Sequence, residues 1–158
     1  MRKRSKYKPK GVRLDNLSWV KAGFGKVGTL PKAGIDLKLK NHEALDSFMR
    51  GEASKDHVDA LIAAFNIAEA IYRVNPNLGI DYASEIKAGQ DAIHSMAQRG
   101  LKVGKFLFTG PEMQAVRLAM DVHDAQLDEC TVREMEKAID LVSKTILNRQ
   151  ARTIVETA

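Results

Sequence analysis

The sequence predicts an all-α protein: a compact bundle of about four to five helices with a short extended segment and a basic, flexible N-terminal arm. Apolar residues recur at spacings of three and four through most of residues 41–158, the period of amphipathic helices. Glycine, proline and asparagine separate these stretches where helices should end. Residues 1–13 hold seven Lys or Arg and no acid, and they show no apolar periodicity, so we expect them to stay mobile until something binds them. The chain therefore divides into the arm (1–13), a connecting region (14–40) and the helical bundle (41–158).

Composition indicates one cytoplasmic domain. A chain of 158 residues with 44% apolar and 28% charged residues can build its own core. No apolar run approaches the ~20 residues that cross a bilayer, and none follows the basic start as in a secretory signal. The single cysteine, Cys130, cannot form an internal disulfide, which fits a reducing compartment, and we expect it to be a small buried apolar residue.

The connecting region is predicted to contain a short helix and an extended segment. Asp15 can cap the helix and Gly23 can end it. Its apolar residues are Leu14, Leu17 and Val20, with Trp19 beside them. A glycine-rich connection follows, and in residues 35–40 apolar and charged side chains alternate. This period of two predicts a short strand or extended segment that lies against the bundle.

Capping residues and helix breakers set the expected limits of the other helices. Asn41 is the expected N-cap of a short helix that Gly51 ends, and Ser54 caps a longer one that runs to Asn75. A third helix is expected from about Ile80 to Arg99, before Gly100, and residues 101–108 are expected to be extended. The last two helices are expected to start at Thr109-Gly110-Pro111 and at the capping box Thr131–Glu134. Residues expected to face the core include Leu61, Phe65, Tyr82, Ile86, Ile93, Val116, Met120, Ile139 and Ile146.

Two patterns resemble catalytic or ligand sites but lack the necessary context. Residues 23–28 match GxGxxG, yet no strand is expected before them and no acidic residue follows in a βαβ unit, so a hinge is favoured over a nucleotide site. Asp121, Asp124 and Asp128 line one side of the fourth helix, with Glu129 next to them. A solvated face or a dock for basic groups is favoured over a magnesium site, because no loop of oxygen ligands accompanies the run. We therefore expect no cofactor and no metal.

Glu69 and His123 are the candidate buried polar residues, because each falls on the apolar face of its helix. An ionised carboxylate at such a position needs a partner, and His123, Arg117 or a backbone donor could supply it. A contact that fixes helix register is favoured over proton transfer. No serine or cysteine stands in a nucleophile pattern, so we expect no enzymatic activity.

The arm is the strongest functional signal. Clustered cations neutralise phosphates and release counterions, which gives sequence-independent binding, and an aromatic ring among them can stack on an unpaired base. The predicted nucleic-acid contacts in the arm are Arg2, Lys3, Arg4, Lys6, Tyr7, Lys8, Lys10 and Arg13. Lys102 and Lys105, beside Phe106 and Phe108 and with Arg99 close in sequence, are predicted to form a second patch.

The segments RKRSKYKPKGVRLDN, LKNHEALD, HDAQLDECTVREMEKAIDLV and IVETA resemble a group of small uncharacterised proteins of proteobacterial bacteriophages and prophages. The resemblance covers most of the chain and implies expression in a bacterial host cytoplasm. It implies no particular catalytic or binding residues. It does suggest the classes of activity common among small phage proteins, which are gene regulation, nucleic-acid binding and inhibition of host defences.

These observations lead to one hypothesis with two alternatives. The first is a non-enzymatic phage accessory protein that binds DNA or RNA mainly through its arm. One alternative is an inhibitor of a host protein complex, of the anti-defence or anti-CRISPR type, that acts by protein–protein binding. The other is a virion assembly protein whose arm contacts the genome. Self-association is compatible with all three.

Overall fold

The computed structural model describes residues 25–27 and 33–148, and within them it confirms the all-α prediction. The helices are α2 (Ala33–Met49), α3 (Lys55–Val74), the short 3-10 helix η2 (Ile80–Tyr82), α4 (Ala83–Val103), α5 (Gly110–Glu129) and α6 (Val132–Leu147). The part of the chain so described contains no β-strand, only one isolated bridge between Lys26 and Thr131. The predicted arm (1–13) and the short helix predicted between Asp15 and Gly23 lie outside the described residues.

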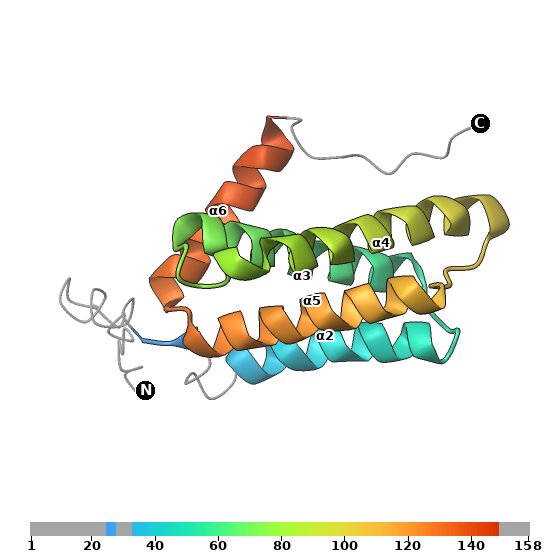
Figure 1. Cartoon of the computed structure of the whole chain (residues 1–158), viewed down its shortest axis with the longest axis horizontal. Helices are drawn as coiled ribbons and strands as arrows, with labels where there is room; N and C mark the ends of the chain where they lie inside the picture. The colour runs from blue at the N-terminus through green and yellow to red at the C-terminus, as the bar shows by residue number, and fades with distance from the viewer. Residues whose placement is uncertain (1–24, 28–32, 149–158) are drawn as a thin grey trace, which may run out of the picture.

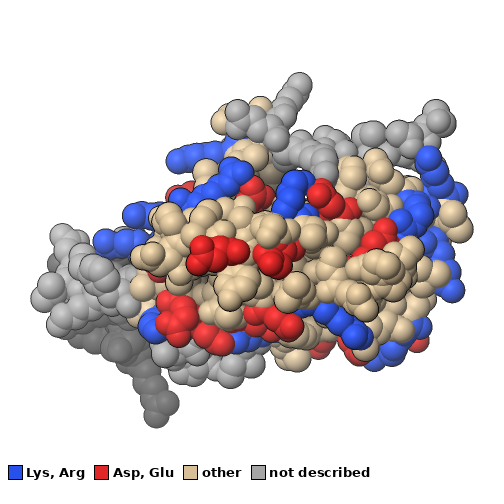
Figure 2. All heavy atoms as spheres, viewed as in Figure 1, with Lys and Arg blue, Asp and Glu red and all other residues tan. Residues whose placement is uncertain are grey.

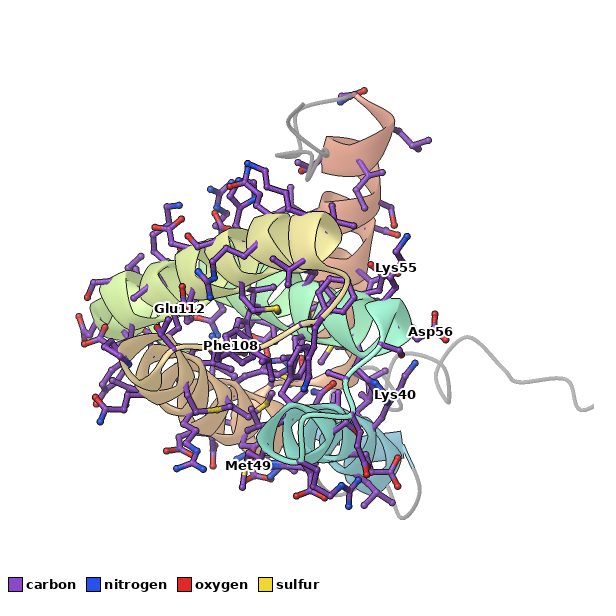
Figure 3. The ribbon with its side chains drawn as sticks, turned by 90° about the vertical axis from the view of Figure 1, so that its right-hand side faces the viewer. Lys40, Met49, Lys55, Asp56, Phe108 and Glu112 are labelled. Atoms are coloured by element: carbon purple, nitrogen blue, oxygen red, sulfur yellow. The ribbon has the colours of Figure 1, made fainter. Side chains whose placement is uncertain are left out.

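Four helices form the bundle, and the fifth leaves it at one end (Figure 1). α3 packs against α2, α4 and α5, and α4 makes its most extensive contact with α5. α6 packs against α3. Figures 1 and 3 both show the C-terminal half of α6 standing clear of the other helices. The helices α2 to α5 therefore enclose the main core, whereas the C-terminal half of α6 projects away from them.

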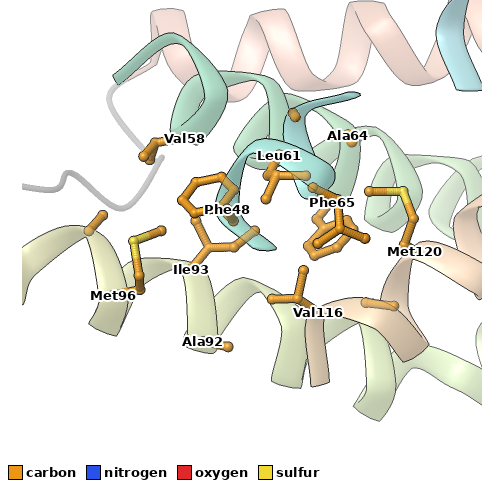
Figure 4. Packing of buried hydrophobic residues seen from close by; sticks show 14 of the residues in the cluster. Phe48, Val58, Leu61, Ala64, Phe65, Ala92, Ile93, Met96, Val116 and Met120 are labelled. Atoms are coloured by element: carbon orange, nitrogen blue, oxygen red, sulfur yellow. The ribbon is translucent and has the colours of Figure 1, made fainter. Parts of the chain in front are cut away.

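The main core lies where α2, α3, α4 and α5 face one another (Figure 4). Its largest fully buried side chains include Phe65, Leu61, Ile93, Met96 and Met120, as the helical spacing predicts for most of them. A smaller second core joins α3 to α6 and contains Val27, Ile71, Leu127, Cys130, Met135 and Ala138. Burial of these two apolar faces stabilises helices that would be marginal alone.

The predicted extended segment at residues 35–40 is wrong, because those residues form the first turns of α2. Asn41 is likewise not an N-cap but a buried residue inside the helix. In the helix, Lys38, Asn41, Leu45 and Phe48 follow one another at spacings of three and four, so they share one face. A charged residue is accommodated at the start of this face because the Lys38 ammonium group pairs with Asp128 of α5 at 2.6 Å. Six alternating residues were too few to distinguish a strand from a helix.

The third predicted helix begins and ends later than expected. Residues 80–82 form η2, which leaves Tyr82 53% exposed rather than in the core. Gly100 does not stop α4 but lies buried within it, and the helix ends at Gly104, whose φ of 78° suits glycine. Only residues 104–108 of the expected extended stretch are therefore outside a helix.

The predicted helix starts at Thr109 and Thr131 are confirmed. The Thr109 hydroxyl accepts a hydrogen bond from the Glu112 backbone N–H, and the Glu112 carboxylate accepts one from the Thr109 N–H at 2.9 Å. Thr131 and Glu134 make the same reciprocal pair at the start of α6. These boxes satisfy donors that a helix N-terminus otherwise leaves unpaired.

Candidate nucleic-acid interface and polar groups of the bundle

The last residues of α4 and the connection to α5, together called the α4–α5 turn, present two of the predicted phosphate-binding lysines, Lys102 and Lys105. Lys102 and Lys105 are exposed, and neither forms an ion pair with any residue that the structure describes. Val103 lies between them and is 78% exposed. Figure 2 shows Lys and Arg side chains gathered at this end of the visible face. Both side chains are therefore open to solvent, and their contact with phosphates stays a prediction.

The aromatic part of this predicted patch is wrong. Phe106 is 9% exposed and its ring covers Gly100, where an added Cβ would lie 2.1 Å from Cδ1 of the ring. Phe108 packs on Phe48 with ring centroids 4.8 Å apart, and Figure 3 shows it pointing into the bundle. Both rings therefore help to close the end of the core, with Phe106 buried and Phe108 half-buried, rather than standing free on the surface for a base to stack on.

Arg99 belongs to the structure of the turn rather than to a binding surface. Its guanidinium donates to the two Glu112 carboxylate oxygens, at 2.7 and 2.5 Å, and to the Leu107 carbonyl at 3.2 Å. The hydrogen bond from Arg99 holds the pKa of the Glu112 carboxyl below its usual value, with the Thr109 backbone adding to the effect. Because Glu112 also completes the α5 capping box, this pair fixes the end of α4 to the start of α5.

The acidic run of α5 is a dock for basic groups of the same chain. Asp128 pairs with Lys38, Asp124 Oδ2 lies 2.6 Å from His42 Nε2, and Glu129 pairs with Lys26 at 2.6 Å. Among the described residues, no group of three or more His, Cys, Asp or Glu side chains is arranged to hold a metal ion. The sequence could not show this, because the partners are distant in the chain and were expected in other elements.

Glu69 and His123 do not form a pair, so that part of the prediction is wrong. The Glu69 carboxylate accepts hydrogen bonds from Arg73, one helical turn away, and from Gln90 Nε2 at 2.8 Å. The Glu69 side chain is 27% exposed, so it is half-buried rather than buried and its ion pair reaches solvent. Arg117, the other predicted partner, contacts the Met49 sulfur.

His123 is buried as predicted, and its partner is Gln126 on the same helix. The imidazole Nδ1 lies 3.4 Å from Gln126 Oε1, and the residue is 2% exposed. Burial lowers the pKa of His123 to about 4, so the ring is neutral at pH 7. The Gln126 amide donates to the carbonyls of Ala68 and Leu78, at 3.0 and 2.8 Å, and so ties α5 to the end of α3. Gln126 was missed, although a polar residue three positions after His123 on the same face was a usable signal.

The glycine-rich motif and Cys130 meet at the junction of α5 and α6. The Val27 N–H donates to the Cys130 carbonyl at 2.9 Å, and the Val132 N–H donates to the Gly25 carbonyl at 2.8 Å. Val27 is buried there, so the described part of the motif is a packed anchor rather than a hinge. Cys130 is fully buried, as predicted, and burial raises the pKa of its thiol to about 11. That value disfavours the reactive thiolate at neutral pH.

Comparison with known proteins adds no relative. No family model matches the chain, and neither a curated protein nor a solved structure matches it significantly. Within residues 25–27 and 33–148, none of the helices has the length and apolar character needed to span a bilayer.

Proposed function

We propose that this protein is a non-enzymatic, phage-type accessory protein that binds the phosphate backbone of nucleic acid through its basic N-terminal arm. The observation that carries the proposal is the separation of charge along the chain. Residues 25–27 and 33–148 hold 14 basic and 18 acidic side chains, a balance of −4, whereas residues 1–13 hold seven basic and no acidic ones. Such an arm attracts a polyanion independently of its sequence.

The ion pairs of the bundle support an external partner for the arm. Seven of the 18 acidic residues of the described ranges already pair with Lys or Arg of the same ranges, and an eighth, Asp124, lies at hydrogen-bond distance from His42. The seven are Asp46, Glu52, Glu69, Asp91, Glu112, Asp128 and Glu129. Their carboxylates are therefore less available to neutralise seven further charges. Lys102 and Lys105, which have no such pairing, supply a second cationic contact on the bundle.

Salt dependence gives the proposal a measurable magnitude. If all seven arm cations contact duplex DNA, the logarithm of the binding constant falls against the logarithm of salt concentration with a slope of about −6. Affinity then drops about 10³- to 10⁴-fold between 50 and 200 mM salt. Single strands give a shallower slope of about −5 for the same number of contacts.

The test is a titration of fluorescent single-stranded and duplex oligonucleotides with the full-length protein at several salt concentrations, read by anisotropy. A variant with all seven arm cations replaced by Gln should lose most of the slope and the affinity. Lys102→Gln with Lys105→Gln should reduce the slope by up to about 2. The control is Arg73→Gln with Lys87→Gln, which removes the same charge from cations already paired with Glu69 and Asp91.

The control should leave the slope nearly unchanged. If the slope fell equally in the control and in the Lys102 and Lys105 variant, only net charge would matter. The two lysines would then not be part of the interface. Undetectable binding of the unmodified protein at 50 mM salt would refute the proposal as a whole.

A further inference from the structure

An apolar stripe on α6 has no covering element among the residues that the structure describes. Of the 16 residues of α6, only Met135 and Ala138 are buried. Ile139 and Ile146 are 46% and 56% exposed, although they follow the half-buried Val132 at intervals of seven residues. Residues seven apart lie on nearly the same side of a helix. Val132, Ile139 and Ile146 therefore form one line, here called the α6 stripe. Val132 packs against the second core at the foot of α6, and the stripe continues toward the C-terminal half of the helix, which stands clear of the bundle (Figures 1 and 3).

The chain that precedes Gly25 starts at the foot of this stripe. The Gly25 carbonyl accepts a hydrogen bond from the N–H of Val132, the lowest residue of the stripe. The bridge between Lys26 and Thr131 is antiparallel. Followed backwards from Gly25, the chain therefore leaves in the direction in which the chain after Thr131 enters α6.

The length of chain before Gly25 also matches the length of the α6 stripe. From Val132 to Ile139, and again from Ile139 to Ile146, the rise along α6 is ~10 Å. Residues 23 and 24, if extended, span ~7 Å, and the predicted helix between Asp15 and Gly23 adds ~1.5 Å per residue, which brings Val20 ~11 Å along α6, to the level of Ile139. From Val20 back to Leu14 the chain rises a further ~10 Å, which reaches the level of Ile146.

We propose that residues 14–20 pack on the α6 stripe, with Val20 near Ile139 and Leu14 near Ile146. The segment offers Leu14, Leu17 and Val20 at a spacing of three, which suits the apolar line it would cover. The inference goes beyond the proposed function and does not depend on it. Its consequence is that the basic arm, residues 1–13, begins at the free end of α6 rather than beside the turn that carries Lys102 and Lys105.

Charge on the edge of the stripe agrees with this occupant. Glu136 and Asp140 are exposed beside Ile139, and neither has an ion pair with another described residue. Lys21 directly follows the apolar segment in the sequence and brings an opposite charge to that edge.

Disulfide trapping in the full-length protein tests the proposal. The pairs Val20→Cys with Ile139→Cys and Leu14→Cys with Ile146→Cys should each form an intrachain cross-link under mild oxidation, detected on non-reducing gels and by peptide mass. Cross-linking requires Cα atoms within about 7 Å, so it reports contact rather than general proximity. The native Cys130 is fully buried and should stay out of the reaction. Val20→Cys with Leu118→Cys is the matched control, because Leu118 is a 50% exposed apolar residue on α5.

The proposal predicts efficient cross-links in the two α6 pairs and little in the control. It is overturned if the α6 pairs stay reduced, if the control pair cross-links equally well, or if the cross-links join two chains. The last result would assign the stripe to a second copy.

The fluorescence of Trp19 provides an independent test that needs no cross-link. It is the only tryptophan in the chain and lies within the segment. Ile139→Glu with Ile146→Glu should increase the quenching of its fluorescence by acrylamide, whereas Val103→Glu with Leu118→Glu, at two other exposed apolar positions, should not. Unchanged quenching in the α6 variant would contradict the packing. The Gln-substituted arm of the binding experiment should keep the quenching of the unmodified protein, so the two proposals can fail separately.

Discussion

Replacing Gly89 by alanine should destabilise the bundle, although alanine is normally the better residue inside a helix. Gly89 is buried in α4, where the helix packs against α3 and α5. A methyl group there would lie 2.5 Å from Cβ of Ala119 on α5 and 2.9 Å from Cε2 of Phe65 on α3. Favourable contacts between carbon atoms need about 3.5–4.0 Å, so α4 and α5 would have to separate by about 1 Å.

Two opposing terms set the size of the effect. The change from glycine to alanine in a helix favours the variant by about 1 kcal/mol. Overpacking a well-filled core costs about 1–3 kcal/mol, and here the upper part of that range applies because Ala119 Cβ is fixed to its backbone and cannot swing aside. We therefore expect a net loss of about 1–2 kcal/mol in the free energy of unfolding.

Urea unfolding followed by circular dichroism measures this loss. The unfolding midpoint of Gly89→Ala should fall by about 0.5–1 M relative to the unmodified protein. Gly110→Ala is the matched control, because, apart from its neighbours in the chain, nothing lies within 4 Å of the position that its methyl group would occupy. It should be neutral or slightly stabilising. If Gly89→Ala were as stable as Gly110→Ala, the close approach of α4 to α5 at this glycine would be refuted.

Three further outcomes follow from the buried polar groups. The pKa of His123 is lowered from 6.5 to about 4 in the folded protein. Between these two pH values the unfolded chain binds a proton at this residue and the folded chain does not, so acidification favours unfolding. The protein should lose roughly 2–3 kcal/mol of stability between pH 7 and 4.5, and His123→Leu should lose much less in urea unfolding at the two pH values. Gln126→Leu leaves the carbonyls of Ala68 and Leu78 without their side-chain donor and should lower the free energy of unfolding by about 1–3 kcal/mol in the same assay. An unchanged unfolding midpoint would contradict these buried hydrogen bonds. Cys130 should react with a thiol reagent at pH 7.5 only as fast as the protein unfolds, because the thiol is buried and its pKa is raised to about 11; rapid reaction of the native protein would contradict this.

Local sequence determined the limits of most helices, because the signals act within one turn. The capping residues Thr109 and Thr131 bind backbone groups three residues away, so they work wherever the helix is placed. Pro76 ends α3 for an equally local reason. The core positions Leu61 and Phe65 followed from periodicity alone, since an apolar face must be covered in a chain of this size.

The candidate site was only partly available from sequence. The charge of the arm and the exposure of Lys102 and Lys105 follow from composition and from a turn between two helices. The burial of Phe106 does not follow in this way, because it depends on the space that Gly100 leaves on α4, the helix that precedes it. The same applies to Arg99, whose carboxylate partner is 13 residues away.

By itself, then, the sequence determined that the protein is a helical bundle joined to a cationic arm, because helical period, capping and net charge are properties of neighbouring residues. Only the tertiary structure decided how the polar groups are used. Residues 35–40 alternate like a strand but become helix α2, where Lys38 and His42 meet the acids of α5. Glu69 and His123 share neither a hydrogen bond nor a partner, since contacts between distant residues depend on how the helices are packed and rotated.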